Sequence, residues 1–282
     1  MKITNKNNLP SAFVNIAQEQ RDIVDKHYSV TTILKGVREI LLTRRHNDEL
    51  ESDVSDMIWA VWGTAVHHVL EQADDENVVE LSLKKEIKDG YYLTGQCDLY
   101  NKHTFTIEDY KTASVWKIVN GDLDDWKKQG MMYAWLAVNM GWHVGKIKFH
   151  ALLKDWSPAK ARQGGNYPKS AITTIEWKVS AYDLLEIEEF IMSKFDKIIA
   201  NEPIGDDKLP KCSEKERWAT PTKWAVMKKG RKSAVKLYDS EEDLPEVMDP
   251  YYVVKREGES RKCMDYCPVR EICKFGSKGG SK

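Results

Sequence analysis

Apolar residues recur at helical spacing through the first quarter of the chain. Residues 10 to 50 read as helical, most clearly in the segment 29–46, whose apolar positions repeat every three or four residues. The segment 53–73 predicts a second helix, with Asp53 or Ser55 as its N-cap. Gly63 inside that helix predicts a close approach to another element.

The period then changes to that of strands. Three short runs at 78–87, 91–100 and 104–113 are rich in β-forming residues and are separated by turn sequences. Beyond them the pattern predicts a helix from Leu123 to Met140, a strand at 146–156, a loop at 157–168, a strand at 171–179 and a helix at 180–200 capped by Ser180. This order favours an α/β fold, with a mixed, mostly meander sheet flanked by helices.

Pro203 and Gly205 mark a boundary in this pattern. We expect a core over residues 1–204 that includes the N-terminal helical region, a basic Cys-rich subdomain over 205–275, and a disordered tail at 276–282. Within the subdomain, residues 223–238 predict a hairpin that turns at Lys229 and Gly230.

Composition excludes several classes of protein. The chain is 282 residues long with 41% hydrophobic and 31% charged residues, which supports a packed core and excludes a disordered or fibrous chain. No apolar run approaches the roughly 20 residues that span a bilayer, and the N-terminus has no secretory h-region. We therefore expect no membrane partner and a cytoplasmic location, in the host cytoplasm if a phage encodes the chain.

The formal net charge of −1 hides a local asymmetry. Between Lys208 and Lys236 ten basic residues stand against two acidic ones, a charge of +8. Trp218, Trp224 and Tyr238 are interleaved with these charges. A solvated face explains a charge run equally well, but basic residues mixed with aromatics also suit a phosphate backbone with unstacked bases.

Acidic and imidazole side chains occur at informative positions. His67 and Glu71 lie four residues apart and share one helix face, whereas Asp109 and Lys111 lie two apart on one strand face. If the turn is the two-residue loop His103–Thr104, Asp98 falls directly opposite Asp109.

Like charges in that arrangement repel, and a divalent cation is the simplest compensation. Alternation places Phe105 and Ile107 on the face of Asp109, so we expect the acid and Lys111 to serve a site rather than a solvated surface. Carboxylates, an imidazole and a lysine suit metal-assisted phosphodiester cleavage, with Lys111 orienting or deprotonating a water.

The ordered combination of four motifs resembles the RecB-like branch of the PD-(D/E)XK nuclease superfamily. The motifs are GTAVHHVLE at 63–71, GQCD at 95–98, IEDYKT at 107–112 and QGMMY at 129–133, and the resemblance covers about residues 30 to 153. It implies a restriction-endonuclease-like core.

The resemblance also implies roles for particular residues. His67, Asp98, Asp109 and the carbonyl of Tyr110 would be metal ligands. Lys111 would be the catalytic lysine, with Glu71 as a further acid. Gln129 and Tyr133 match a QxxxY motif that faces DNA in this branch.

Three of the five cysteines crowd the C-terminal end. Cys263, Cys267 and Cys273 lie in a short segment within reach of one metal centre, and Cys212 is a candidate fourth ligand. We expect Cys97 to be a buried small hydrophobic residue. Branch members with such cysteines hold an iron–sulfur cluster, so the resemblance implies a [4Fe–4S] cluster. A structural zinc is the alternative, because four thiolates suit either.

Together these features predict a Mg²⁺- or Mn²⁺-dependent deoxyribonuclease. The resemblance favours an exonuclease that acts on DNA ends or single strands, in recombination, repair or phage DNA metabolism, with a single-strand annealing or other recombination protein as a partner. The alternative is a non-catalytic DNA-binding module that keeps the metal site structurally. A small-molecule phosphoesterase is disfavoured by the basic segment.

Overall fold

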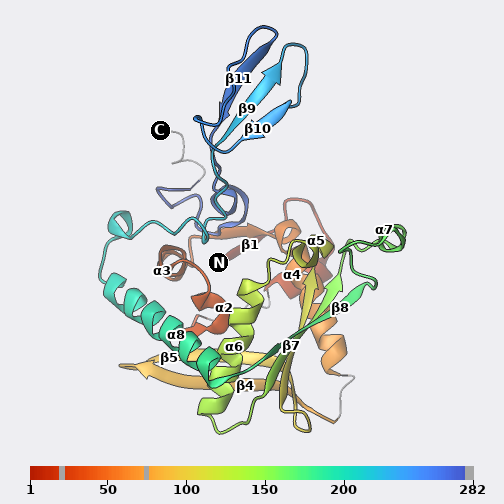
Figure 1. Cartoon of the computed structure of the whole chain (residues 1–282). Coiled ribbons are helices and arrows are strands. Elements are labelled where there is room, and N and C mark those ends of the chain that lie inside the picture. The colour runs from red at the N-terminus through yellow and green to blue at the C-terminus, as the bar shows by residue number, and fades with distance from the viewer. Residues whose placement is uncertain (19–22, 73–75, 277–282) are drawn as a thin grey trace. The chain divides into compact units, whose positions relative to one another are not determined.

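In the computed structural model, residues 1–18, 23–72 and 76–276 are described, without the side chain of Glu71. The chain divides into two compact units, Met1–Ile204 and Gly205–Lys282, which are treated separately below. The first unit is a mixed α/β fold, as the sequence predicts (Figure 1). Its elements are β1 (Lys2–Thr4), α1 (Ser11–Gln18), β2 (His27–Ser29), α2 (Val30–Ile33), α3 (Val37–Arg45), β3 (Glu51–Asp53), α4 (Val54–Glu71), β4 (Val78–Lys88), β5 (Tyr91–Asn101), β6 (Thr106–Ala113), α5 (Val115–Val119), α6 (Asp124–Asn139), β7 (Lys146–Leu153), α7 (Pro158–Gln163), β8 (Ile172–Lys178) and α8 (Ala181–Asn201).

The main sheet is built around the long strand β5. Its order is β2-β5-β6-β7-β8, and β4 also pairs with β5. The pairs β4–β5, β5–β6 and β7–β8 are antiparallel, whereas β2–β5 and β6–β7 are parallel. Helices α5 and α6 form the crossover between β6 and β7, as a parallel pair requires. The sheet is therefore mixed.

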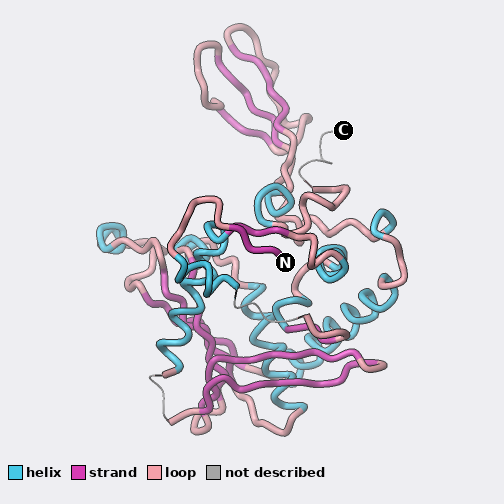
Figure 2. The backbone as a smooth tube through the Cα atoms, turned by 180° about the vertical axis from the view of Figure 1, so that it is seen from behind, coloured by secondary structure: helices cyan, strands magenta, loops and turns pink. Residues whose placement is uncertain are grey.

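Helix α6 is the central helix of the unit. It packs against β4, β5, β6 and β7 on one side and α8 on another, and the views from front and back show α6 and α8 on the same face of the sheet (Figures 1 and 2). Every residue from Met131 to Ala137 is therefore buried. Gly130 allows this close approach, because a Cβ there would lie 2.5 Å from Cδ1 of Ile147 and 2.8 Å from Cε2 of Phe149.

Helix caps follow the sequence closely. The side chain of Asp53 accepts a hydrogen bond from the amide of Ser55 at the start of α4. Ser180 and Asp183 form a reciprocal capping box at the start of α8. A Cβ at Gly63 would lie 3.3 Å from Oγ1 of Thr112, so α4 approaches β6 closely at the predicted glycine.

The N-terminal region differs from the expected continuous helix. Strand β2 interrupts residues 10–50, because Tyr28 is buried where β2 pairs with the distant strand β5. The predicted helix over 29–46 is two helices, α2 and α3, with Gly36 in extended conformation as the N-cap of α3. The expected loop at 157–168 contains α7, which Ser157 caps and Pro158 begins.

The second unit contains a three-stranded antiparallel sheet of order β10-β9-β11. Its strands are β9 (Lys223–Lys228), β10 (Lys236–Tyr238) and β11 (Tyr251–Arg256), and it also has short helical turns at Asp206–Lys208 and Lys262–Tyr266. The hairpin β9–β10 turns through Lys229 and Gly230, as predicted, but β11 was not foreseen. Most of the tail expected to be disordered, residues 277–282, lies outside the described residues. No helix in the described ranges is long and apolar enough to cross a membrane.

Candidate active site

Strands β5 and β6 set the geometry of the site. They pair Leu99 with Glu108 and Asn101 with Thr106, which is the predicted register. Continued by one residue, this register sets Asp98 beside Asp109. There the side chain of Asp98 contacts the backbone of β6, because its Oδ2 accepts a hydrogen bond from the amide of Tyr110 at 2.6 Å.

The turn between these strands is longer than expected. It spans residues 102–105, and the side chain of Asn101 accepts hydrogen bonds from the amides of His103 and Thr104, both at 3.0 Å. Phe105 has φ +52° and is 45% exposed. The prediction that Phe105 shares the apolar face of Asp109 is therefore wrong, whereas Ile107 is buried.

Asp109 is almost completely buried, at 1% exposure. Its Oδ1 forms an ion pair with Nζ of Lys111, two residues along the strand, and Nζ also lies 5.3 Å from the ring centre of Phe149. Burial raises the pKa of Asp109, whereas the charge of Lys111 lowers it and that of Asp98 raises it. Apart from its contact with Lys111, Oδ1 accepts no hydrogen bond from any described residue, so the charge of Lys111 compensates this buried oxygen.

His67 joins the acids from helix α4. Its Nδ1 lies 3.2 Å from Oδ1 of Asp98, and its ring contacts that of Tyr110 edge to face at 6.3 Å. The hydrogen bond to Asp98 raises the pKa of His67, and burial opposes this. His68 instead approaches the side chain of Gln72, so His67 is the histidine directed at the carboxylates.

Gln129 and Tyr133 also reach this site, but from inside the protein. Nε2 of Gln129 donates a hydrogen bond to the hydroxyl of Tyr133 at 2.9 Å and lies 3.5 Å from Oδ2 of Asp109. Both side chains are buried, and the contact with DNA that the motif resemblance implies for them stays a prediction. Gly95 makes room for the ring of Tyr133, because a Cβ at Gly95 would lie 2.9 Å from Cε1 of that ring.

A cavity of about 580 Å³ opens beside Asp98, one of the two acids. His67 and Asp98 line it together with Thr64, Glu80 and Gln96. None of these last three was predicted from the sequence. Glu80 has φ +49°, and the β4–β5 pairing passes from Val79–Leu99 to Leu81–Cys97 without it. The same strand offset on both sides sets Glu80 opposite Asp98.

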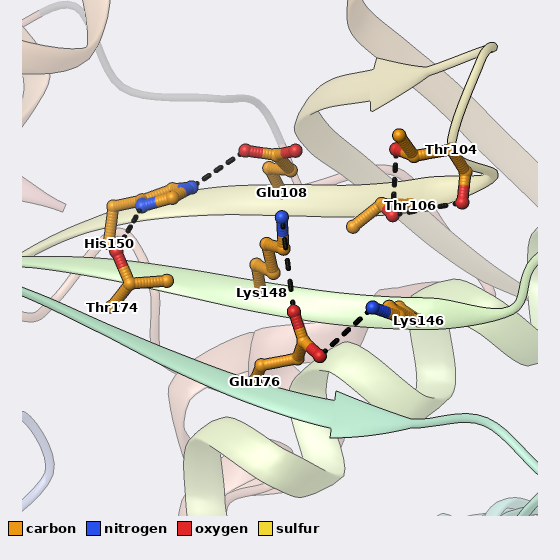
Figure 3. A network of polar contacts seen from close by, with 8 residues as sticks. All are labelled: Thr104, Thr106, Glu108, Lys146, Lys148, His150, Thr174 and Glu176. Carbon is orange, nitrogen blue, oxygen red and sulfur yellow. Dashed lines mark hydrogen bonds and ion pairs between the residues drawn. The ribbon is translucent and has the colours of Figure 1, made fainter.

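Glu108 lies on the opposite face of β6, as alternation predicts. Its Oε2 lies 2.7 Å from Nε2 of His150, whose Nδ1 is 2.9 Å from Oγ1 of Thr174 (Figure 3). Glu176 bridges Lys146 and Lys148 on the same face. These cross-strand contacts satisfy Glu108 away from Asp98 and Asp109, which supports Asp109 as the acid of the third motif.

The other site predictions stay predictions. The side chain of Glu71 lies outside the described part of the structure, and ligation by the carbonyl of Tyr110 is untested. Within the described ranges, no three His, Cys, Asp or Glu side chains are gathered so that they could hold a metal ion. The donor chemistry nevertheless suits a hard cation, because the carboxylates of Asp98 and Asp109 lie on paired strands and the imidazole of His67 contacts Asp98.

The cysteines of the second unit lie on two segments that Arg217 joins. Its Nε donates to the carbonyl of Cys212 at 3.0 Å, and its own carbonyl accepts from the amide of Lys262 at 3.1 Å, next to Cys263. Cys212, Cys263, Cys267 and Cys273 are unoxidised and half-buried. Cys97 is fully buried in the first unit, and burial raises its pKa to about 12.

Comparisons with known proteins find similarity in structure alone. No protein-family model and no curated protein matches the chain. The protein SSO0001 is 16% identical, with a TM-score of 0.48 over 66% of this chain and 83% of that one. An alkaline exonuclease from Laribacter hongkongensis is 9% identical, with a TM-score of 0.39 over 63% and 90%. A phage-related exonuclease from Haemophilus somnus is 13% identical, with a TM-score of 0.33 over 58% and 81%. In its ordered motifs, the chain resembles the RecB-like branch of the PD-(D/E)XK superfamily.

Proposed function

We propose that this chain is a Mg²⁺- or Mn²⁺-dependent deoxyribonuclease. One observation carries the proposal: Asp98 and Asp109 lie on adjacent strands, with His67 and Lys111 in direct contact with one acid each. A cavity at His67 and Asp98 gives a substrate access to this group. The similar structures named as exonucleases agree with the proposal.

The residues divide the chemistry between them. Asp98, Asp109 and His67 would hold the cation, which when bound would polarise a phosphoryl oxygen and acidify a water. Lys111 supplies positive charge beside Asp109, where it would orient the attacking water and offset negative charge developing on the phosphate. The amide of Tyr110 and the ring of Tyr110 hold Asp98 and His67 in place.

Cleavage assays test this proposal directly. End-labelled single- and double-stranded DNA is incubated with the protein and Mn²⁺ or Mg²⁺, and the product ladder separates exonuclease from endonuclease action. We expect exonucleolytic products, from DNA ends or single strands. Asp109→Asn and Lys111→Met should each remove nearly all cleavage.

The matched control is Glu108→Gln, which neutralises the neighbouring acid on the opposite strand face and should retain activity. Ca²⁺ should bind without supporting turnover, and Mn²⁺ binding measured by calorimetry should be lost in Asp98→Asn. Wild-type cleavage in Asp109→Asn, or full cleavage in excess EDTA, would contradict the proposal. DNA binding without cleavage under any cation would favour the non-catalytic DNA-binding module.

We further propose that Cys212, Cys263, Cys267 and Cys273 hold one [4Fe–4S] cluster, with structural zinc as the alternative. The donor set is all thiol, and Arg217 already joins the two segments that carry it. A centre at this position would close a loop of about fifty residues, worth on the order of 4 kcal/mol in the chain-entropy model.

Metal analysis of anaerobically purified protein decides between these forms. Near-stoichiometric iron and sulfide support the cluster, whereas one zinc per chain supports the alternative. Cys267→Ser should lose the metal and become poorly soluble, while Cys97→Ala in the first unit should keep it. If the wild-type protein contains neither iron nor zinc and the Cys267→Ser variant still folds, there is no metal site at these cysteines.

In the cell, the proposed partners are DNA and a single-strand annealing or other recombination protein, in recombination, repair or phage DNA metabolism. This assignment rests on the motif resemblance. Copurification of an annealing protein with the chain, dependent on neither DNA nor the cation, would support it.

A further inference from the structure

One face of the sheet in the second unit combines lysines with aromatic residues. Directly opposed residues of antiparallel strands share a face, and neighbours along a strand alternate between faces. The register opposes Trp224 to both Tyr238 and Lys255, Val226 to Lys236 and Val253, and Lys228 to Tyr251. The lysine–aromatic face, as we name it, therefore consists of Trp224, Val226, Lys228, Lys236, Tyr238, Tyr251, Val253 and Lys255.

The lysines and rings of this face are paired in space. Nζ of Lys228 lies 5.6 Å from the ring centre of Tyr251, and Nζ of Lys236 lies 4.8 Å from that of Tyr238. Nζ of Lys255 lies 6.0 Å from the ring centre of Trp224. Each pair presents a positive charge and an aromatic surface at one position. The three pairs involve all three strands.

The opposite face has a different character. It carries Ala225, Met227, Leu237, Tyr252 and Val254, with Lys223 and Arg256 at one end. Arg256 turns toward Met227, with Nη2 3.6 Å from its Sδ. Tyr251 and Tyr252 are adjacent in sequence and therefore belong to different faces. Their exposed fractions are similar, at 40% and 43%.

Charge compensation leaves the lysine–aromatic face positive. None of its eight residues is acidic, and of its three lysines Lys255 pairs with an acid, Glu257, at 2.7 Å. The connection from β10 to β11 carries six acids. Asp239 pairs with Lys223 and Asp249 with Lys229, both off this face, whereas the charge of Glu241 acts on Lys255. In the part of the chain that the structure describes, Lys228 and Lys236 have no ion-pair partner.

We propose that the lysine–aromatic face binds single-stranded DNA. Lysine charges would contact successive phosphates. The exposed ring of Tyr251 and the half-buried rings of Trp224 and Tyr238 would stack on bases, which only a single strand offers. The lysine stem is flexible, so each ammonium can move from its ring to a phosphate. The choice of DNA over RNA rests on the proposed function, whereas the binding itself needs neither the cation nor Asp98 and Asp109.

Fluorescence anisotropy with a labelled 20-nucleotide oligo(dT), in EDTA on the full chain, tests the proposal without cleavage. Tyr251→Ala should weaken binding about fivefold or more, whereas Tyr252→Ala should change it little. The triple variant Lys228→Gln/Lys236→Gln/Lys255→Gln should also weaken binding. It should reduce the slope of log K against log salt by about 2, from three phosphate contacts.

The matched charge control is Lys223→Gln/Lys229→Gln/Arg256→Gln, which removes the same charge from positions off the face and should keep most of the slope. Circular dichroism checks that each variant is folded. Equal effects of the two triple variants, equal effects of the two tyrosine variants, or tighter binding of duplex or RNA of the same length would overturn the proposal. Loss of cleavage with this binding intact would instead count against the proposed function alone.

Discussion

Gln129 donates a hydrogen bond to the hydroxyl of Tyr133 at 2.9 Å, one helical turn further along α6. The same amide nitrogen lies 3.5 Å from Oδ2 of Asp109, so α6 and β6 meet through a buried polar contact. The two residues of the QxxxY motif thus contact each other and one of the proposed metal-binding acids. Their effect on the site is therefore coupled to the stability of the core.

This contact predicts that Gln129→Leu is destabilising. The substitution leaves two buried oxygens without their amide donor, which should lower the free energy of unfolding by roughly 1–3 kcal/mol in urea. Tyr133→Phe removes only the hydroxyl and keeps the ring against Gly95, so its cost should be about 0.5–1.5 kcal/mol. If Gln129→Leu keeps full stability and only weakens DNA binding, the side chain faces DNA, as the motif resemblance implies.

The ion pair of Asp109 and Lys111 predicts strong coupling between the two residues. Lys111→Met leaves a buried carboxylate without its cation and should cost roughly 3–5 kcal/mol of unfolding free energy. The double variant Asp109→Asn/Lys111→Met removes both charges and should recover most of that loss. Urea unfolding of the wild type, both single variants and the double variant in EDTA gives the free energies of a double-mutant cycle. Additive effects would show that the two side chains do not interact.

Local sequence patterns predicted those features that depend on neighbouring residues. The register of β5 and β6, the cap at Ser180 and the close approach at Gly63 all follow from alternation, capping chemistry or glycine placement. The opposition of Asp98 and Asp109 was predicted because register depends on the total offset between strands. The predicted register is therefore correct although the predicted turn length is not.

Features set by distant partners could not be predicted in this way. Strand β2 is three residues long and forms where it pairs with the distant strand β5, so it has no strong local signal. Strand β11 does have one, since it begins with four β-forming residues, Tyr251–Val254. The motif resemblance implies that Gln129 faces DNA, and no local pattern shows that Asp109 and Tyr133 give its amide buried partners.

The contact at Gly130 predicts a steric cost for the smallest side chain. In Gly130→Ala the new methyl group would meet Ile147 and Phe149 within 3 Å, so core side chains must shift. We expect a loss of about 1–3 kcal/mol in unfolding free energy despite the better helix propensity of alanine. Gly145→Ala is the control, because the nearest atom to its Cβ would be 4.0 Å away. Equal losses of unfolding free energy in the two variants, measured in urea, would contradict close packing of α6 on β7.

The last prediction concerns alkaline pH and the carboxylate of Glu202. It accepts hydrogen bonds from Tyr28, at 2.9 Å, and from Tyr91, and both tyrosines are buried. Burial, assisted by the bond to Glu202, raises the pKa of Tyr91 to about 12 and also raises that of Tyr28. A raised pKa means that the folded state holds the phenol proton more tightly than the unfolded state, whose tyrosines titrate near pH 10.

The resulting stabilisation is complete below pH 10 and is lost as the pH rises from about 10 to 12. Unfolding free energies in urea, measured between pH 8 and 11.5, should therefore fall more steeply for the wild type than for Tyr91→Phe, which has no proton to lose there. The control is Tyr182→Phe, which removes a tyrosine that is 75% exposed and should follow the wild-type curve. Superimposable curves for the wild type and Tyr91→Phe would show that the buried phenol does not control alkaline unfolding.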